Sequence, residues 1–132
     1  MRAFDADVLI HASTGDPRGD LLANAVAEAA PGGVAGLGSV LLLTETLVPG
    51  VAEPHHPRLR GLLARLRLVP VTREVAAVAA TLRGVHGLKT PDALHLATAI
   101  VAGADQFVTG NRRDFDPRMP EIEIVLVGQP RS

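Results

Sequence analysis

The sequence predicts an α/β domain built around a central parallel sheet. Short apolar runs of strand length alternate along the chain with longer segments that have helix-capping signals, an order typical of βα units. The chain has 132 residues, and we expect one domain spanning 1–132 because domains cluster near about 100–150 residues. A composition that is 47% hydrophobic and 20% charged supports a buried core and excludes a disordered tail.

The first half of the chain is expected to contain two strands, each followed by helical segments. Asp16-Pro17 is a helix-start signal, and Pro31-Gly32-Gly33 ends that helix. Ser39 is a favourable N-cap for the next helix, which Pro49-Gly50 ends. In chain order, the expected elements are a strand over 2–5, a helical turn over 8–12, a helix over 16–30, a strand near 34–36 and a helix over 40–48.

The second half continues the alternation of helices and short apolar strands. Thr72 caps one helix, in which Val75 and Leu82 fall at helical spacing, and Thr90-Pro91 starts the most apolar helix. In chain order, the expected elements are a helix over 58–66, a strand over 67–71, helices over 73–83 and 92–102, a strand over 106–109, a helical turn over 112–115 and a strand over 122–127.

Composition excludes several classes of protein. The chain has 13 Lys+Arg against 14 Asp+Glu, which argues against a protein that binds nucleic acid mainly by neutralising many phosphates. It has only three aromatic residues, all Phe, which argues against recognition by stacking of bases on aromatic side chains. The absence of Cys excludes disulfides and thiolate zinc sites. No apolar stretch approaches the roughly 18 residues of a membrane span, and Asp5 and Asp7 interrupt the N-terminal run that a secretory signal needs. We expect a cytoplasmic protein with no membrane association.

Four acidic residues lie in apolar surroundings, where solvated charges are not expected. They are Asp5, Glu45, Asp92 and Asp114. In a parallel α/β sheet, residues just past the strand ends and in the first turn of the following helices converge on one crevice. This rule places Asp5, Asp92 and Asp114 on the same edge, with Asn111 beside them. Glu45 reaches that edge only if its helix packs across the first strand.

Carboxylates brought together repel one another, and a bound hard cation is the ordinary remedy. An all-oxygen site favours Mg²⁺ or Mn²⁺ over zinc, and a site of this kind is suited to cleavage of a phosphodiester.

Each acid also has a structural explanation. Asp7 fits the N-cap of the following helix, and Asp92 fits the acidic first turn of its own helix. Asp5 is also compatible with a structural acid whose hydrogen bonds are all made within the protein, and Glu45 with an acid on a helix surface. Asp114 is compatible with a helix cap or with an ion pair to an arginine.

Four blocks of the sequence resemble PIN-domain proteins of the VapC-like toxin type. The opening Asp-Ala-Asp-Val-Leu-Ile at 5–10 is similar to that family's first motif, and Ser-Val-Leu-Leu-Leu-Thr-Glu at 39–45 is similar to its Ser-to-Glu helix. The stretch at 86–99, His-Gly-Leu-Lys-Thr-Pro-Asp-Ala-Leu-His-Leu-Ala-Thr-Ala, is the most specific. Val-Thr-Gly-Asn-Arg-Arg-Asp-Phe at 108–115 resembles the final motif. The order and spacing of all four blocks agree with the family.

The resemblance implies a PIN-like three-layer α/β/α fold and an Mg²⁺-dependent endoribonuclease, with Mn²⁺ as a substitute metal. Asp5, Glu45 and Asp92 would be the core acids, with the metal held by Asp5 and Asp92. Glu45 or Asp114 would orient the attacking water. The partners implied are an RNA substrate, a small antitoxin protein and a second copy of the chain in a homodimer.

Two positions depart from the family pattern. The fourth acidic position falls on Asn111, which lowers the charge of the site by one, and Ala6-Asp7 stands where Thr and Asn or Ser are usual. Basic residues adjoin the site, and we expect Lys89, Arg112 and Arg113 to bind substrate together with Asn111.

Two other functions remain open at this point. Asp-x-Asp-Val after a strand also resembles the opening of haloacid-dehalogenase-type phosphotransferases, with Asp5 as nucleophile and Asp7 as acid/base. Alternatively, Asn111 weakens the site enough for a PIN fold that only binds a partner.

The histidines have structural and functional interpretations. His95 shares the helix face of Asp92, where a packed core role is favoured over a metal or substrate role. His55-His56 is interpreted as a loop before a helix.

Overall fold

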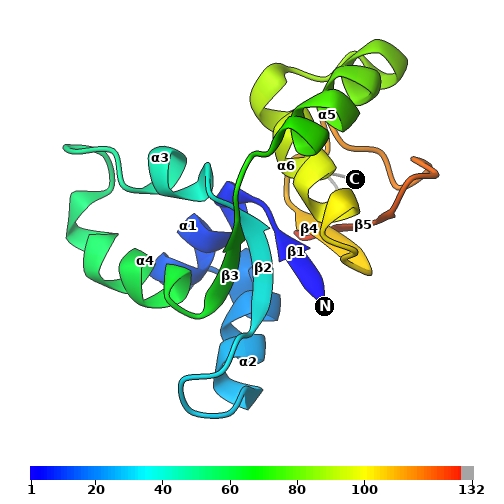
Figure 1. Ribbon diagram of the computed structural model, residues 1–132. Helices are drawn as coiled ribbons and strands as arrows, with labels where there is room; N and C mark the ends of the chain where they lie inside the picture. The colour runs from blue at the N-terminus through cyan, green and yellow to red at the C-terminus, as the bar shows by residue number, and fades with distance from the viewer. Residues whose placement is uncertain (129–132) are drawn as a thin grey trace.

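The computed structural model describes residues 1–128 and contains a five-stranded parallel sheet. The spatial order of the strands is β3-β2-β1-β4-β5, and every neighbouring pair is parallel. The strands are β1 (Arg2–Phe4), β2 (Gly36–Ser39), β3 (Leu66–Val69), β4 (Gln106–Thr109) and β5 (Glu123–Leu126). Helices cover both faces of the sheet (Figure 1), which confirms the predicted three-layer α/β/α fold.

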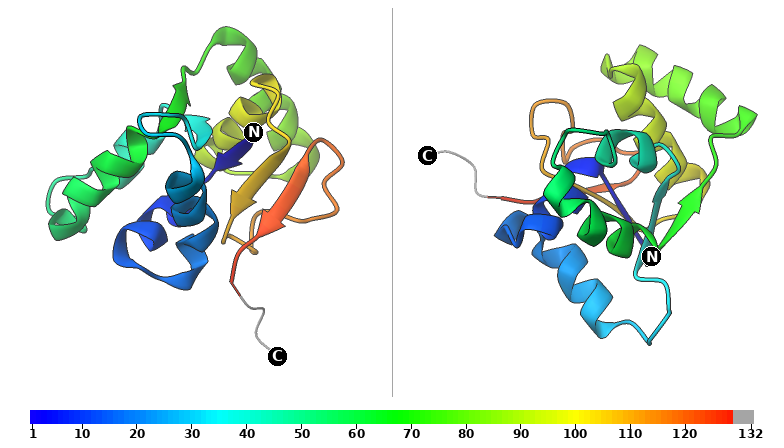
Figure 2. Two further views of the ribbon diagram at one scale, coloured as in Figure 1. Left: turned by 90° about the horizontal axis from the view of Figure 1, so that it is seen from below. Right: turned by 90° about the vertical axis from the view of Figure 1, so that its left-hand side faces the viewer.

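The helices form two layers that pack on opposite faces of the sheet, as the right-hand view of Figure 2 shows. One layer consists of α5 and α6, and the other includes α1, α2 and α4, with the short α3 against α1. Their bounds are α1 (Ala6–Thr14), α2 (Asp20–Glu28), α3 (Leu42–Thr46), α4 (His56–Leu63), α5 (Arg73–His86) and α6 (Thr90–Val101), with 3-10 turns at η1 (Pro17–Gly19) and η2 (Glu53–His55). Among the described residues, none of the helices combines the length and the apolar character needed to span a bilayer.

Two hydrophobic clusters form because successive strand side chains point to opposite faces. Ala3 and Phe107 belong to the cluster under α5 and α6, whereas Phe4 and Val108 belong to the cluster under α1 and α4. Phe107 also contacts Phe115, with ring centroids 5.0 Å apart. This contact fixes the loop that follows β4 against the core.

The strand β2 spans Gly36–Ser39, whereas the sequence predicted a strand near 34–36 and a helix over 40–48. Ser39 pairs with Val69 in the sheet, and this pairing keeps it extended as the last strand residue. Its Oγ nevertheless accepts a hydrogen bond from the Leu41 N–H at 3.1 Å. The helix that follows is shorter than predicted and covers only Leu42–Thr46.

One other local prediction was wrong. The helix predicted over 16–30 is divided into η1 and α2, because Gly19 lies against the α1 backbone. A Cβ at Gly19 would be 2.1 Å from the Ala12 nitrogen. The short helical turn predicted over 112–115 is present as a single turn, closed by a hydrogen bond at 3.1 Å from the Phe115 N–H to the Asn111 carbonyl four residues earlier. The other elements lie within a few residues of their predicted bounds.

The close approach of β2 to β1 predicts a large effect of one methyl group. A Cβ at Gly36 would lie 2.5 Å from Cε2 of the buried Phe4 and 2.9 Å from the Arg2 carbonyl oxygen. We expect Gly36→Ala to lower the free energy of unfolding by about 1–3 kcal/mol through overpacking. The matched control is Gly61→Ala in α4, where nothing lies within 4 Å, and it is expected to stabilise by about 0.5–1 kcal/mol. Urea unfolding measures both, and equal midpoints for the two variants would contradict the prediction.

Candidate functional site

Asp5 lies directly after β1 and is the N-cap of α1. Its Oδ1 accepts a hydrogen bond from the Ala6 N–H at 2.9 Å, and its Oδ2 accepts one from the Thr109 hydroxyl at 2.8 Å. The Asp5 N–H donates to the Val108 carbonyl at 3.0 Å, which extends the pairing of β1 with β4 by one residue. The carboxylate is therefore held by α1 and β4, and the residue is only 7% exposed.

Burial raises the pKa of Asp5 to about 6. His95 opposes this shift with its positive charge, and the neighbouring Asp7 adds to it. A buried carboxyl with a perturbed pKa is destabilising unless a positive charge lies near it, and such groups are concentrated at functional sites.

Asp92 lies in the first turn of α6 and is half-buried. Burial is the main reason that its pKa is raised, and a hydrogen bond and charge repulsion from Asp114 add to the effect. Glu45 raises the pKa of Asp92 as well. Three acids that are far apart in the sequence are therefore close enough to interact electrostatically, namely Asp92, Asp114 and Glu45.

Glu45 reaches the site through a histidine. It lies on α3, which packs against α1, and its carboxylate Oε1 is hydrogen-bonded to Nε2 of His95. The sequence analysis required this helix to pack across the first strand, whereas α3 packs against α1, the helix that follows that strand.

His95 is both buried and in contact with an acid. Its side chain is 2% exposed, and its Nδ1 has no hydrogen-bond partner among the described residues. Burial disfavours the charged ring, but the Glu45 hydrogen bond and the charges of Asp5 and Asp92 outweigh burial and raise the pKa of His95. The sequence analysis favoured a packed core role for His95 and did not predict its contact with Glu45. Its position three residues after Asp92 was the available signal.

The loop after β4 positions Asp114 through Asn111. The Asn111 side-chain amide donates to Oδ2 of Asp114 at 2.9 Å, and its Oδ1 accepts from the Asp114 N–H at 3.3 Å. Asn111 lowers the pKa of Asp114, and the charges of Lys89 and Arg113 act in the same direction. Both polar groups of the Asn111 side chain therefore have partners within the loop.

The three basic residues selected from the sequence differ in their surroundings. Lys89 and Arg113 are exposed and near Asp114. Arg112 instead donates to the Gly128 carbonyl beyond β5. Lys89 and Arg113 are thus the two cations that the structure brings to the acidic groups.

Asp7 and Thr109 have roles that the sequence analysis did not assign. The expectation that Asp7 caps α1 was wrong, because Asp5, with extended backbone angles, occupies that position. Asp7 Oδ2 instead accepts from the Gly110 N–H at 2.8 Å, and burial raises the pKa of Asp7. Thr109 is buried and donates to Asp5. A threonine at the end of a buried strand was its only sequence signal.

The donor set is suited to a hard divalent cation. Asp5 and Asp92 carry carboxylate oxygens, the donors that hard cations prefer, and burial is the main reason that the pKa of each is raised. In residues 1–128, no group of three or more His, Cys, Asp and Glu side chains is arranged to hold a metal ion. The chemistry of the two carboxylates is that of sites in which Mg²⁺ is bound by one or two carboxylates plus water and substrate phosphate. The sequence analysis also considered His56, and this histidine has a structural contact, because its Nε2 is 2.8 Å from the Val51 carbonyl oxygen.

Two hollows border these acids. One, of about 230 Å³, is lined in part by Glu45, Pro91 and Leu94, and the other, of about 560 Å³, in part by Asp114 and Met119.

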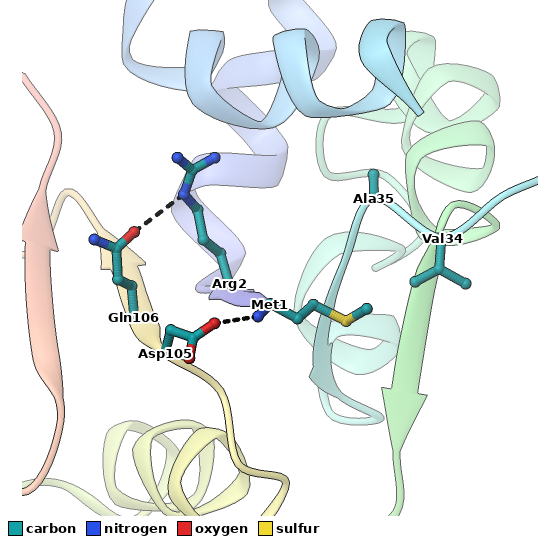
Figure 3. Close-up of a pocket in the computed structure, with 6 residues that line it drawn as sticks. All are labelled: Met1, Arg2, Val34, Ala35, Asp105 and Gln106. Atoms are coloured by element: carbon teal, nitrogen blue, oxygen red, sulfur yellow. Dashed lines mark hydrogen bonds and ion pairs between the residues drawn. The ribbon is translucent and has the colours of Figure 1, made fainter. Parts of the chain in front are cut away.

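A further hollow lies at the opposite edge of the sheet. It is lined by Met1 and Arg2 of the β1 end, by Val34 and Ala35, and by Asp105 and Gln106. Its polar groups are paired with one another, Met1 with Asp105 and Arg2 with Gln106 (Figure 3), and it lies away from the candidate site.

Two solved structures of other proteins are similar to this one, whereas no match was found among curated proteins. A toxin–antitoxin complex from Klebsiella pneumoniae has a similar structure, with 25% identity over 95% of this chain and 96% of that chain and a TM-score of 0.74. VapBC2 from Rickettsia felis, bound to a promoter DNA fragment, has 17% identity over 96% and 98% of the two chains and a TM-score of 0.67.

A family comparison covers most of the chain and all of the acidic residues described above. The PIN domain family matches residues 3–117. The resemblance inferred from four sequence blocks is thereby confirmed, and the chain belongs to the PIN domain family.

Proposed function

We propose that this PIN domain is a metal-dependent endoribonuclease and the toxin of a toxin–antitoxin pair. PIN domains are generally nucleases, which supports hydrolysis of a phosphodiester. The observation that carries the proposal is the buried Asp5 carboxylate with a pKa of about 6, at the strand edge where Asp92, Glu45 and Asp114 also lie. Asp5 and Asp92, whose pKa values are raised mainly by burial, are explained by a function in which positive charge is bound beside them.

Asp5 and Asp92 are the proposed ligands of Mg²⁺, with Mn²⁺ as a substitute. When bound, the cation supplies positive charge to the scissile phosphate and makes an attacking water more acidic. Asp5 suits this role because its hydrogen bonds from Thr109 and Ala6 leave the carboxylate no freedom to turn. Asp92 lies in the first turn of a helix that is buried over most of residues 93–99, so its backbone is equally fixed.

Glu45 or Asp114 orients the attacking water, and the contact of Glu45 with His95 favours Glu45 as the group that accepts its proton. The water oxygen bonds to phosphorus, the bond from phosphorus to the 3′-oxygen breaks, and the leaving oxygen takes up a proton. The product is a 5′-phosphate, and no covalent enzyme intermediate is formed. Lys89 and Arg113 contact substrate phosphates, with Arg112 and Asn111 at the margin of the site.

Single-stranded or looped RNA is the proposed substrate. The three Phe residues are each 1% exposed, so the chain offers no aromatic surface on which bases can stack. Recognition therefore rests on phosphate contacts and on the shape of the RNA.

A small antitoxin protein is the proposed partner. Both similar structures are described as toxin–antitoxin assemblies or as VapBC. Exposed apolar side chains are frequent around α3, where Val40, Leu43, Val48 and Val51 are 36%, 38%, 39% and 58% exposed, and these could be covered by a partner chain. The homodimer and the extent of the domain, 1–132, stay predictions.

Removal of either proposed metal ligand tests the catalytic assignment. We expect Asp5→Asn and Asp92→Asn each to lower kcat/KM for RNA cleavage by about a thousandfold, or ~4 kcal/mol of transition-state stabilisation. Asp20→Asn, which removes an exposed acid from the first turn of α2, is the charge-matched control and should be fully active. Cleavage of a labelled RNA pool in Mg²⁺ measures this. Retained activity in Asp5→Asn or Asp92→Asn would refute the site, and an inactive but correctly folded parent would favour a binding module.

Thermal stability tests cation binding independently of activity. With its pKa raised to about 6, Asp5 is protonated at pH 5 and charged at pH 8, so the penalty for burying the charge is present only at the higher pH. At about a hundred times its Kd, Mn²⁺ should stabilise the protein at pH 8 by about 2.7 kcal/mol, or roughly 10 °C in Tm.

The Mn²⁺-dependent shift in Tm should be much smaller at pH 5, because protons compete for the carboxylate. Asp5→Asn should lose the shift at both pH values, whereas Asp20→Asn should keep it. Equal shifts at the two pH values would contradict the assignment of Asp5 as a ligand.

A further inference from the structure

Glu45 is weakly anchored by its own element. The helix α3 has five residues, and the Glu45 side chain is 37% exposed. A glutamate in such a place samples several rotamers, and each of them puts the carboxylate in a different position. Within residues 1–128, the hydrogen bond recorded for this carboxylate is the one to His95. The position of Glu45 therefore depends on a residue of another helix.

His95 is a rigid anchor. It lies in the second turn of α6, among residues 93–99 that are buried apart from the half-buried Leu94. The ring cannot change rotamer without disturbing that packing. Because a carboxylate accepts hydrogen bonds, the proton of this contact lies on Nε2 of the ring.

Packing alone does not explain a histidine at this position. Nδ1 is buried without a partner in the described part of the chain, and a buried polar atom left unpaired destabilises the fold. An aliphatic side chain would fill the space without that penalty. The ring is in contact with Glu45 on α3, and it also interacts electrostatically with Asp5 after β1 and Asp92 on α6.

We propose that His95 is a positioning residue that holds Glu45 in the site by donating a hydrogen bond from Nε2 to its carboxylate. The inference rests on the proposed nuclease function, in which Glu45 orients the attacking water. One carboxylate oxygen, Oε1, is bound by the ring, and Oε2 is left to accept a hydrogen bond from water. The histidine thus acts on the reaction through Glu45 and does not touch the substrate.

Three substitutions test whether His95 acts through a hydrogen-bond donor at the place of Nε2. The amide nitrogen of Gln reaches the place of Nε2, whereas that of Asn reaches only the place of Nδ1, and Leu has no donor. We expect His95→Asn and His95→Leu to lose about 10²-fold in kcat, the loss that misplacement of a catalytic group causes, with little change in KM. His95→Gln should recover most of that loss. His11→Leu, which breaks a 4.0 Å pairing with Asp16, is the control and should leave kcat unchanged.

Two further measurements distinguish positioning from a structural role. In an E45Q background, His95→Leu should cause no additional loss of kcat, because the group that it positions is already disabled. In the metal-free protein, the imidazole ¹⁵N spectrum should show a protonated, hydrogen-bonded Nε2 whose resonance shifts in E45Q. Circular dichroism and Tm show whether each variant is folded.

The outcomes separate the two proposals. A parent protein that cleaves no RNA overturns the proposed function and this inference with it. An active parent in which His95→Leu is folded and equally active overturns the inference alone. So does a loss of kcat in His95→Leu that persists in the E45Q background, or a His95→Gln variant that is folded but as impaired as His95→Leu.

Discussion

The burial of one carboxylate, that of Asp5, is the constraint on which the rest of the site depends. The group is 7% exposed and is bonded to the start of α1 and to the end of β4. These contacts fix its position, but they do not supply the positive charge that a buried anion requires, and its pKa is about 6 as a result. The fold tolerates this because two large hydrophobic clusters, one on each face of the sheet, stabilise the surrounding strands.

The charges around Asp5 are unevenly distributed, although the chain as a whole is almost neutral. The net charge is −1, yet the acids and bases are not mixed evenly. Acids gather at the strand edge, His95 lies among them, and Lys89 and Arg113 flank Asp114 on the exposed side. Under the proposed function, a polyanion would approach through the flanking cations, and a bound divalent ion would offset the repulsion from the acids.

The sequence was sufficient for those parts of the site that follow from sheet geometry. Asp5 and Asp92 were predictable because strand ends and helix starts converge at one edge of a parallel sheet. The contact of Glu45 with His95 was not, since it joins residues 50 positions apart and depends on how α3 packs. Strand β2 was misplaced for a similar reason: Gly36 disfavours a strand in isolation, and the Phe4 ring and the Arg2 carbonyl oxygen of the neighbouring strand explain why no larger residue fits.

The parallel topology has a consequence for the time at which the site forms. Strand β1 pairs with β4, and Asp5 meets the Thr109 hydroxyl across a sequence separation of 104 residues. During synthesis, which proceeds at about 5–20 residues per second, the first strand has no β4 to pair with until most of the chain has been made. Such non-local pairing is slow to form. The acids of the site therefore assemble late, and a nascent chain that carries Asp5, Glu45 and even Asp92 has no active centre until β4 joins the sheet.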